Sequence, residues 1–514
     1  MAVGNVLLIT LDQFRADCLS SAGHRLVRTP AIDALAADGV RFTHHFNQCA
    51  PCGPSRTSLH TGQYLMNHRS VANGTPVDDR FTNIAREMRG LGYVPTLFGY
   101  TDMPVDPRTV TRGDDPRLSN WEGVCAGFDV ALNLDSSLAP WGRWLTSLGY
   151  DVPSEVGRMY IPEGDRWGPT RYAAEHSDTA FLTNELLSWV GRQDGPWFAH
   201  ASYIRPHPPF VAPAPYHVLT SPDDVDLPIP AEEPAIHPFV AAMRSVRGVG
   251  ASSDPDIVRR VRAMYYGMIA EVDAQMGRLW DGLRAHGVWD DTLVILTSDH
   301  GEQLGDHGLA GKLGFYDQSF RIPCVVRDPR PRGARGRVVD AFTENVDVMA
   351  TILDWLDAEI PVQCDGRSLL GWLGDAQPPE WRDAAHFEFD WRGFPTRNLP
   401  GSVAERVTRQ SQLAAGRATR MSQWPFGRET EAMNLAVRRD ATSAYVQFAD
   451  GSALYFDLAA DPDQLTSDLD SSGAFAAARA MLSWRMQHAD RTLSGVTIDA
   501  QGLRGRLPRL PFDA

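Results

Sequence analysis

Apolar runs and helical segments alternate along roughly the first 375 residues of the chain. Residues 6–11 and 292–297 are almost continuously apolar, as is typical of strands buried on both faces of a parallel sheet. Apolar residues recur every three or four positions over 178–191 and 256–286, which predicts amphipathic helices. This alternation predicts an α/β fold with a doubly wound, mostly parallel sheet flanked by helices.

Weaker patterns fill the rest of this region. Further strands are predicted at 94–98 and 197–203. Residues 103–175 are rich in Pro, Gly, Asp and Trp and are expected to form irregular loops over the sheet. Residues 211–255 form a Pro- and Asp-rich excursion that is too long for a simple connection, so we expect a functional wall or an oligomer contact there.

The last quarter of the chain has a different pattern. Antiparallel strands are predicted at 386–391 and within 444–458, where Asp450-Gly451 is a hairpin turn signal, and a helix is predicted at 474–488. We therefore divide the chain into a catalytic α/β domain at 1–375, a smaller C-terminal antiparallel subdomain at 376–490 and an extended tail at 491–514. The tail could be an oligomer arm or a frayed terminus.

The composition limits the classes of molecule that the protein could bind. The 514 residues carry a formal net charge of -15 and are 43% hydrophobic, which suits a globular protein and argues against nucleic-acid binding. An anionic small molecule remains compatible, because a metal or a basic cluster can reverse the field locally. The N-terminus has no signal-peptide pattern and no apolar stretch approaches about 20 residues, so we expect a cytoplasmic protein without a membrane span.

The strongest local chemistry surrounds Cys52. Pro54 suits the first turn of a helix and Gly62 its end, so Cys52 is predicted at a helix N-terminus, where free N–H groups favour negative charge. Arg56 follows one turn later on the same face. Two other interpretations stay open, namely a redox C-x-x-C pair with Cys49 and a buried structural cysteine.

Acidic residues follow the two apolar strands. Asp12 comes after the first strand, and Asp299 and His300 come after 292–297. Open α/β sheets bind ligands at the carboxyl ends of their strands, and two carboxylates with an imidazole suit a divalent metal. Each motif taken singly also has a simpler interpretation. Asp12 could merely cap the following turn, and Asp299-His300 could lie in a solvated loop.

Taken jointly, these motifs resemble a known family. C-G-P-S-R at 52–56, followed by Leu59, Thr61 and Gly62, is similar to the sulfatase signature C-x-P-S-R, with His60 where leucine is usual. S-D-H-G-E-Q-L-G-D-H-G at 298–308, with a lysine behind it, completes the sulfatase order. The chain resembles the formylglycine-dependent sulfatases of the alkaline phosphatase superfamily, and among them the phosphonate monoester hydrolases and related dimeric arylsulfatases.

The resemblance implies the following roles. A formylglycine-generating enzyme would convert Cys52 into the nucleophile, and Arg56 and Lys312 would position it and the transferring anion. His207, in a rigid Pro-flanked loop, or Lys312 would be the general acid. The metal ligands would be Asp12, Cys52, Asp299 and His300. The substrate side would be lined by Gln13, Asn73, Tyr100 and Asp102.

Three positions differ from the residues expected by resemblance, two from the common sulfatase pattern and one from the phosphonate monoester hydrolase branch. Gln13 stands where many sulfatases have a second aspartate, and His300 where many have asparagine. One carboxylate fewer and one imidazole more favour manganese over calcium as the single divalent ion, with zinc also possible. Asp102 stands where threonine is expected in the phosphonate branch, and a carboxylate there would disfavour an extra anionic oxygen.

The predicted function is a metal- and formylglycine-dependent hydrolase of sulfate monoesters, or of phosphonate monoesters and phosphodiesters, acting by double displacement. The resemblance also implies a homo-oligomer, either a dimer or a tetramer. Two alternatives stay open. One is a metal-dependent phosphotransferase or mutase that uses Cys52 as an unmodified thiolate, and the other is a non-catalytic metal-binding relative.

Overall fold

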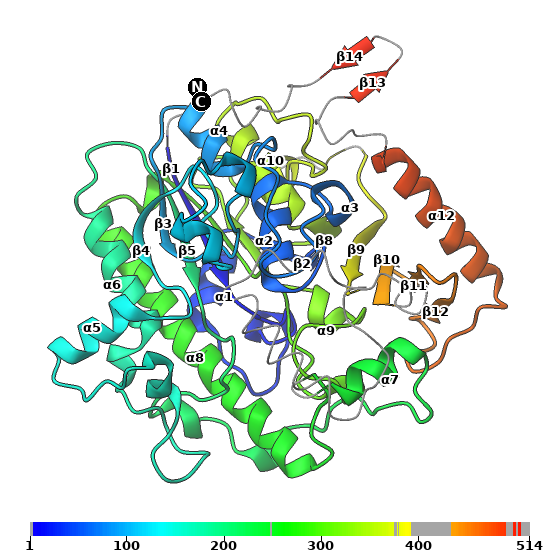
Figure 1. Ribbon diagram of the computed structural model, residues 1–514, viewed down its shortest axis with the longest axis horizontal. Coiled ribbons are helices and arrows are strands. Elements are labelled where there is room, and N and C mark those ends of the chain that lie inside the picture. The colour runs from blue at the N-terminus through cyan, green and yellow to red at the C-terminus, as the bar shows by residue number, and fades with distance from the viewer. Residues whose placement is uncertain are drawn as a thin grey trace.

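The computed structural model describes residues 4–246, 249–374, 380–391 and 433–489, together with Pro378 and the backbone of two short strands near the C-terminus. Its centre is an eight-stranded sheet, in which β7 alone runs antiparallel to its neighbours (Figure 1). In spatial order the strands are β4 (Asp129–Asn133), β3 (Pro95–Gly99), β5 (Phe198–Tyr203), β1 (Asn5–Leu11), β6 (Thr292–Thr297), β7 (Cys324–Arg327), β2 (Val40–Phe46) and β8 (Arg337–Glu344).

Helices cover both faces of this sheet, as the strand pattern predicts. Side chains alternate along β1, so that Leu7 and Ile9 pack on one face and Val6 and Leu8 on the other. The first face is covered by α1 (Pro30–Ala37), α5 (Ala139–Ser147), α6 (Asp178–Val190) and α8 (Pro255–Ala285). The second face is covered by α2 (Cys52–Thr61), α4 (Ile84–Gly90) and α10 (Val346–Trp355).

A separate antiparallel sheet with strand order β12-β11-β10-β9 lies beside the main sheet (Figure 1). Phe46 of β2 stacks on Phe387 of β9, so the two sheets share one apolar cluster. The strands are β9 (Ala384–Asp390), β10 (Asn434–Asp440), β11 (Ser443–Phe448) and β12 (Ala453–Asp457). The remaining elements are α3 (Leu65–His68), α7 (Pro238–Ser245), α9 (Asp317–Phe320), α12 (Ser472–Ala489), β13 (Thr497–Asp499) and β14 (Gly502–Arg504).

The fold class is confirmed, with one correction. The stretch 103–175 is not wholly irregular, because it contains β4 at the edge of the sheet and α5. Most of β4 is exposed and only Leu132 is buried, so the strand lacks the apolar run that marks the central strands. The domain boundary at 375 stays a prediction, and most of the tail lies outside the described residues. No helix in the described ranges is both long and apolar enough to span a bilayer.

Helix α2 is buried along its whole length. It ends as predicted at Gly62, which has a left-handed φ of 68° and donates its N–H to the Ser58 carbonyl. His60, in the last turn, packs edge-on against the rings of His200 and Phe128. Neither ring nitrogen of His60 has a hydrogen-bond partner among the described residues. This imidazole is therefore a source of instability inside the core.

We expect His60→Leu to raise the free energy of unfolding at pH 7 by about 1–2 kcal/mol, because it removes a buried polar group without partners. Burial, with a smaller effect from Arg56, lowers the pKa of folded His60 from 6.5 to about 3. Below about pH 6.5 the unfolded chain therefore binds a proton that the folded chain does not, and acid destabilises the fold. The gain from leucine should increase between pH 7 and pH 5 in urea unfolding curves.

His68→Leu is the matched control. His68 is also buried, but its Nε2 lies 2.9 Å from Ser58 Oγ and its Nδ1 accepts the Ser70 N–H at 3.0 Å. Leucine there would leave the Ser70 N–H without its acceptor and would remove the stronger of the Ser58 hydroxyl's contacts, so we expect a loss of stability at pH 7. The interpretation is wrong if His60→Leu is less stable than the unmodified protein at both pH values.

Candidate active site and metal centre

The carboxyl ends of four neighbouring strands, β3, β5, β1 and β6, meet at one edge of the main sheet. β1 and β6 are parallel, and Thr10 is in register with Thr297. Asp12 and Asp299, each two residues beyond these positions, are thus brought together although 286 residues separate them in sequence. The expected meeting of the two strand ends is confirmed.

Cys52 reaches this edge from the first position of α2. Its Sγ lies 3.2 Å from His300 Nε2 and 2.8 Å from Lys312 Nζ. Asn73, predicted on the substrate side, accepts the Gly53 N–H at 2.9 Å and so holds the start of the helix. A Cβ at Gly53 would lie 3.0 Å from the Asp102 carbonyl oxygen, which explains why a glycine occupies this position.

The four predicted metal ligands, Asp12, Cys52, Asp299 and His300, form one buried cluster. One ligand atom from each lies within 4.8 Å of all the others. Asp12 Oδ1 is buried and has no hydrogen-bond partner among the described residues, as expected of an oxygen kept for a cation. Two carboxylates, an imidazole and a sulfur or its oxygen replacement fit a divalent metal. The residues therefore form a candidate metal site.

Arg56 lies beneath this cluster and is completely buried. Its Nη2 donates to Asp12 Oδ2 at 3.0 Å and its Nε to Asp299 Oδ2 at 3.1 Å. Its Nη1 donates to the Tyr100 carbonyl at 3.1 Å and to Ser202 Oγ at 2.6 Å. The guanidinium is thus committed to the two carboxylates, the Tyr100 carbonyl and Ser202, so it holds two of the predicted metal ligands in place.

Gln13 lies closer to the metal side than predicted. Its backbone N–H donates to Asp299 Oδ1 at 3.1 Å, its Nε2 donates to the buried Glu302, and its Oε1 has no partner among the described residues. That oxygen could serve as a further neutral donor to a cation. Glu302 also accepts the Gly311 N–H at 2.5 Å, next to Lys312. The sequence analysis missed this link, although Glu302 lies inside the motif at 298–308.

Tyr100 and Asp102 follow β3 and approach Arg56 from the other side. The Tyr100 hydroxyl donates to Asp12 Oδ2, and the Arg56 guanidinium stacks 4.2 Å from the centre of the tyrosine ring. Asp102 Oδ2 lies 4.0 Å from Arg56 Nε. Burial raises the pKa of Asp102 to about 7, although Arg56 opposes the shift. Asp102 is therefore part neutral and part ionised near neutral pH.

Lys312 and His207 differ in protonation. Burial alone would lower the pKa of Lys312, but Cys52, Asp12 and Asp299 outweigh it and raise that pKa above its ordinary value. Burial and the positive charge of Lys312 lower the pKa of His207 from 6.5 to about 4. At neutral pH the lysine therefore carries a proton that it can donate, whereas His207 is uncharged.

The loop of His207 is held by Arg205, a residue to which the sequence analysis gave no role. Arg205 Nη1 donates to the carbonyls of His207 and Pro209 at 3.0 and 2.9 Å. The guanidinium also stacks 3.9 Å from the centre of the Tyr160 ring. Arg205 thus fixes the backbone that carries the imidazole.

The two cysteines of the C-x-x-C pair do not form a disulfide. None of the six cysteines forms a disulfide, and all six are buried. Cys49 Sγ lies 3.5 Å from Ser58 Oγ, whereas Cys52 Sγ contacts His300 and Lys312. The two thiols have different partners, so the redox interpretation has no support from the structure.

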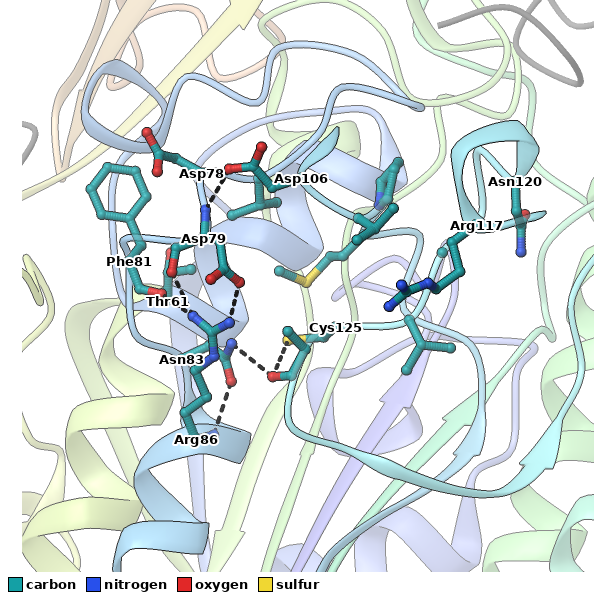
Figure 2. Close-up of a pocket in the computed structure, with 17 residues that line it drawn as sticks. Thr61, Asp78, Asp79, Phe81, Asn83, Arg86, Asp106, Arg117, Asn120 and Cys125 are labelled. Atoms are coloured by element: carbon teal, nitrogen blue, oxygen red, sulfur yellow. Dashed lines mark hydrogen bonds and ion pairs between the residues drawn. The ribbon is translucent and has the colours of Figure 1, made fainter. Parts of the chain in front are cut away.

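A cavity of about 240 Å³ is lined by Met103 and Pro104, directly after Asp102 in the sequence, and by residues around Asp79 and Cys125 (Figure 2). Figure 2 shows that Arg86 pairs with Asp79 and that Asp106 accepts the Asp79 N–H. The other charged groups of the lining, Asp78 and Arg117, pair with Arg80 and Asp115 outside it. None of the predicted site residues lines it. We therefore assign it no part in the chemistry.

Comparison with known proteins places this arrangement in a family. Residues 4–358 match the family model described as Sulfatase. The chain belongs to the sulfatase family. It is thus an ester-bond hydrolase by family, and its fold and motif order agree with this.

Individual relatives match this chain over three quarters of its length or more. The chain is 39% identical to the multifunctional alkaline phosphatase superfamily protein PehA of Trinickia caryophylli, over 98% of this chain and 99% of that protein. It is 29% identical to an arylsulfatase of Clostridium perfringens, over 75% and 81%. The solved phosphonate monoester hydrolase of Agrobacterium radiobacter superposes with a TM-score of 0.84 at 39% identity, covering 98% of this chain and 100% of that one.

We expect Arg56→Met, measured in the presence of a chelator, to lower the free energy of unfolding by about 3–5 kcal/mol, the usual cost of leaving buried charges unpaired. Asp12 and Asp299 would then share a buried site in which Lys312 alone replaces the two neighbouring cations. Added Mn²⁺ should recover part of the loss, because a cation replaces the missing positive charge. Thermal or urea unfolding with and without the metal checks this.

Arg25→Met is the control, because Arg25 and its partner Asp226 are 60% and 81% exposed and such surface pairs contribute about 0–1 kcal/mol. Equal stability of Arg56→Met and the unmodified protein in chelator would show that the guanidinium does not hold the site together.

Proposed function

We propose that this sulfatase-family enzyme hydrolyses sulfate monoesters, or phosphonate monoesters and phosphodiesters, with Cys52 converted to formylglycine. One observation carries the proposal. Cys52 stands at the N-terminus of α2, within the cluster of Asp12, Asp299 and His300 and 2.8 Å from Lys312. Nucleophile, metal ligands and a cationic proton donor thus converge at a single point.

A divalent metal, with manganese favoured over calcium or zinc, would be held by Asp12, Asp299, His300 and residue 52, with Gln13 Oε1 as a further donor. Such an ion supplies Lewis-acid stabilisation of the transferring group. Arg56 fixes both carboxylates, and the dipole of α2, with Cys52 at its N-terminal end, favours negative charge at residue 52. These residues therefore prepare the site for an oxyanion before the substrate arrives.

Lys312 is the better candidate for the general acid. Its ammonium is protonated at neutral pH and lies at the nucleophile, where it can stabilise an equatorial oxygen of the substrate or donate to the leaving oxygen. His207 is neutral in the free enzyme, so we assign it to substrate orientation. The second hydroxyl of hydrated formylglycine would then release the bound oxyanion and regenerate the aldehyde, which gives turnover.

Asp102 bears on the charge of the ester that the site accepts, because sulfate monoesters, phosphonate monoesters and phosphodiesters carry one negative charge and phosphate monoesters carry up to two. The relatives include proteins named as arylsulfatase and as phosphonate monoester hydrolase. A carboxylate that is partly ionised near neutral pH repels an additional anionic oxygen. We therefore propose a preference for singly charged esters over doubly charged ones.

The remaining elements of the proposal concern partners. Conversion of Cys52 requires a formylglycine-generating enzyme. We retain the homo-oligomer, either dimer or tetramer, and the cytoplasmic location as proposals that follow from the sequence.

The test compares 4-nitrophenyl sulfate with 4-nitrophenyl phenylphosphonate, using protein in which mass spectrometry has measured the conversion of Cys52. We expect Cys52→Ala to lower kcat on either ester by about 10⁴-fold or more, the scale of losing a nucleophile. Cys49→Ala, which removes the other thiol of the pair, should keep most of the activity. Full conversion of Cys52 without activity on either ester would overturn the substrate class.

Proton donation by Lys312 should appear as a dependence of the Lys312→Ala rate loss on the leaving group of the ester. We expect a loss of about 10²–10⁴-fold on phenyl sulfate, the usual contribution of a general acid, and a smaller loss on 4-nitrophenyl sulfate, whose leaving group needs less protonation. His207→Ala should lower kcat/KM by a similar factor for both esters. The assignment is reversed if His207→Ala, and not Lys312→Ala, shows the dependence on the leaving group.

A further inference from the structure

A cavity of about 360 Å³ lies between α12 and the β9 edge of the smaller sheet. Its wall combines Tyr64, which follows α2, with Arg382 and His386 at β9 and Trp484 on α12. None of the predicted catalytic or metal-binding residues lines this cavity. It is therefore a separate feature of the fold, formed where the C-terminal helix meets the main body.

His386 is the unusual residue in this wall. Only 4% of it is exposed, and neither ring nitrogen has a hydrogen-bond partner among the described residues. Its ring stacks on Trp484 with centroids 3.9 Å apart and an angle of 3° between the planes. The stack fixes the imidazole face, so the ring nitrogens at its edge are left for a partner. Leaving such a buried group unpaired destabilises the fold.

Cations surround this imidazole. Burial, followed by Arg438, His488, Arg382 and Arg485 in that order, lowers the pKa of His386 well below its ordinary value. The cavity lining contains three arginines and two aspartates, and further carboxylates pair with Arg382 and Arg438 from behind the lining. Arg367 makes no ion pair among the described residues, so its charge is the one that favours an anion over a cation.

The arginines of the lining still have donors to offer. Arg438 donates one Nη to Asp383 at 2.7 Å and the other to Asp440, and its Nε has no partner recorded among the described residues. The Arg367 side chain is exposed and makes no ion pair within the described residues. Arg382, by contrast, is engaged with Asp347 and Glu344. Arg367, Arg438 and His386 are thus the groups with free donor capacity.

A metal is not the occupant that this chemistry suits. Within the described residues, the grouping whose ligand atoms converge as a metal requires is the cluster of Asp12, Cys52, Asp299 and His300. Arginines are hydrogen-bond donors without acceptor capacity, whereas tetrahedral oxyanions present acceptors in several directions. Charge-assisted bonds from guanidinium to such oxygens are among the stronger hydrogen bonds in proteins.

We propose that this cavity binds an inorganic tetrahedral oxyanion, sulfate or phosphate, at a site separate from the catalytic centre. His386 donates from a ring nitrogen, and Arg438 and Arg367 donate from their guanidinium groups. The cavity exceeds the size of one such ion, so water completes its filling. The proposal does not depend on the reaction assigned to the catalytic centre.

Equilibrium dialysis with radiolabelled phosphate and, separately, radiolabelled sulfate tests the site on the full chain. We expect two variants to raise the Kd of the anion at the proposed site at least tenfold. They are His386→Phe, which keeps a ring against Trp484, and Arg367→Glu, which reverses an exposed charge. Both variants should keep kcat for the ester substrate. Arg143→Glu, an exposed charge reversal on α5, should change neither quantity.

Lys312→Ala separates this site from the catalytic one. A binding event at the catalytic centre should be weakened in Lys312→Ala and retained in His386→Phe, and the proposed site should show the opposite pattern. If His386→Phe does not fold, Arg367→Glu alone gives the same comparison. The proposal is overturned if Arg367→Glu and His386→Phe bind both anions as tightly as the unmodified protein. It is also overturned if the unmodified protein shows a single binding event and Lys312→Ala abolishes it.

Discussion

The guanidinium of Arg56 is the interaction on which the site depends. It joins Asp12 after β1, Asp299 after β6 and the Tyr100 carbonyl after β3 within one buried hydrogen-bond network. Two carboxylates this close repel one another strongly in a low-dielectric interior, and a single delocalised cation with donors in a fixed fork offsets both. The packing of three strand ends and the geometry of the metal ligands are therefore set by the same residue.

This network also reconciles an acidic protein with an anionic substrate. The chain has a formal net charge of -15, yet at the site Arg56 and Lys312 balance Asp12 and Asp299. The nearby imidazoles stay neutral, because burial and the neighbouring positive charges lower the pKa of His207 to about 4 and that of His300 to about 3. A divalent cation would then make the pocket locally positive. A local field of this kind outweighs the distant surface charge.

Sequence reasoning succeeded where one strong local signal decided the structure. β6 coincides with its predicted range and α2 begins at Cys52 and ends at Gly62, because a continuous apolar run and a proline–glycine pair act over a few residues. β4 was missed because it is exposed, and the four-residue β7 because it is short. The partners of Arg56 and the contact between Gln13 and Glu302 join residues from 44 to 289 positions apart, and no local pattern encodes them.

Backbone conformation explains why the strand ends, and not flexible loops, determine the site. Gln13 and Asp102 have left-handed φ values of 68° and 52°, although neither is a glycine, and each such residue costs about 1–3 kcal/mol unless its surroundings enforce it. At Gln13 they do, because Asp299 accepts its N–H and Tyr265 donates to its carbonyl at 2.7 Å. The turn after β1 is thus held by bonds from β6 and α8. Its side-chain amide is fixed by Glu302, so Oε1 is oriented before any cation binds.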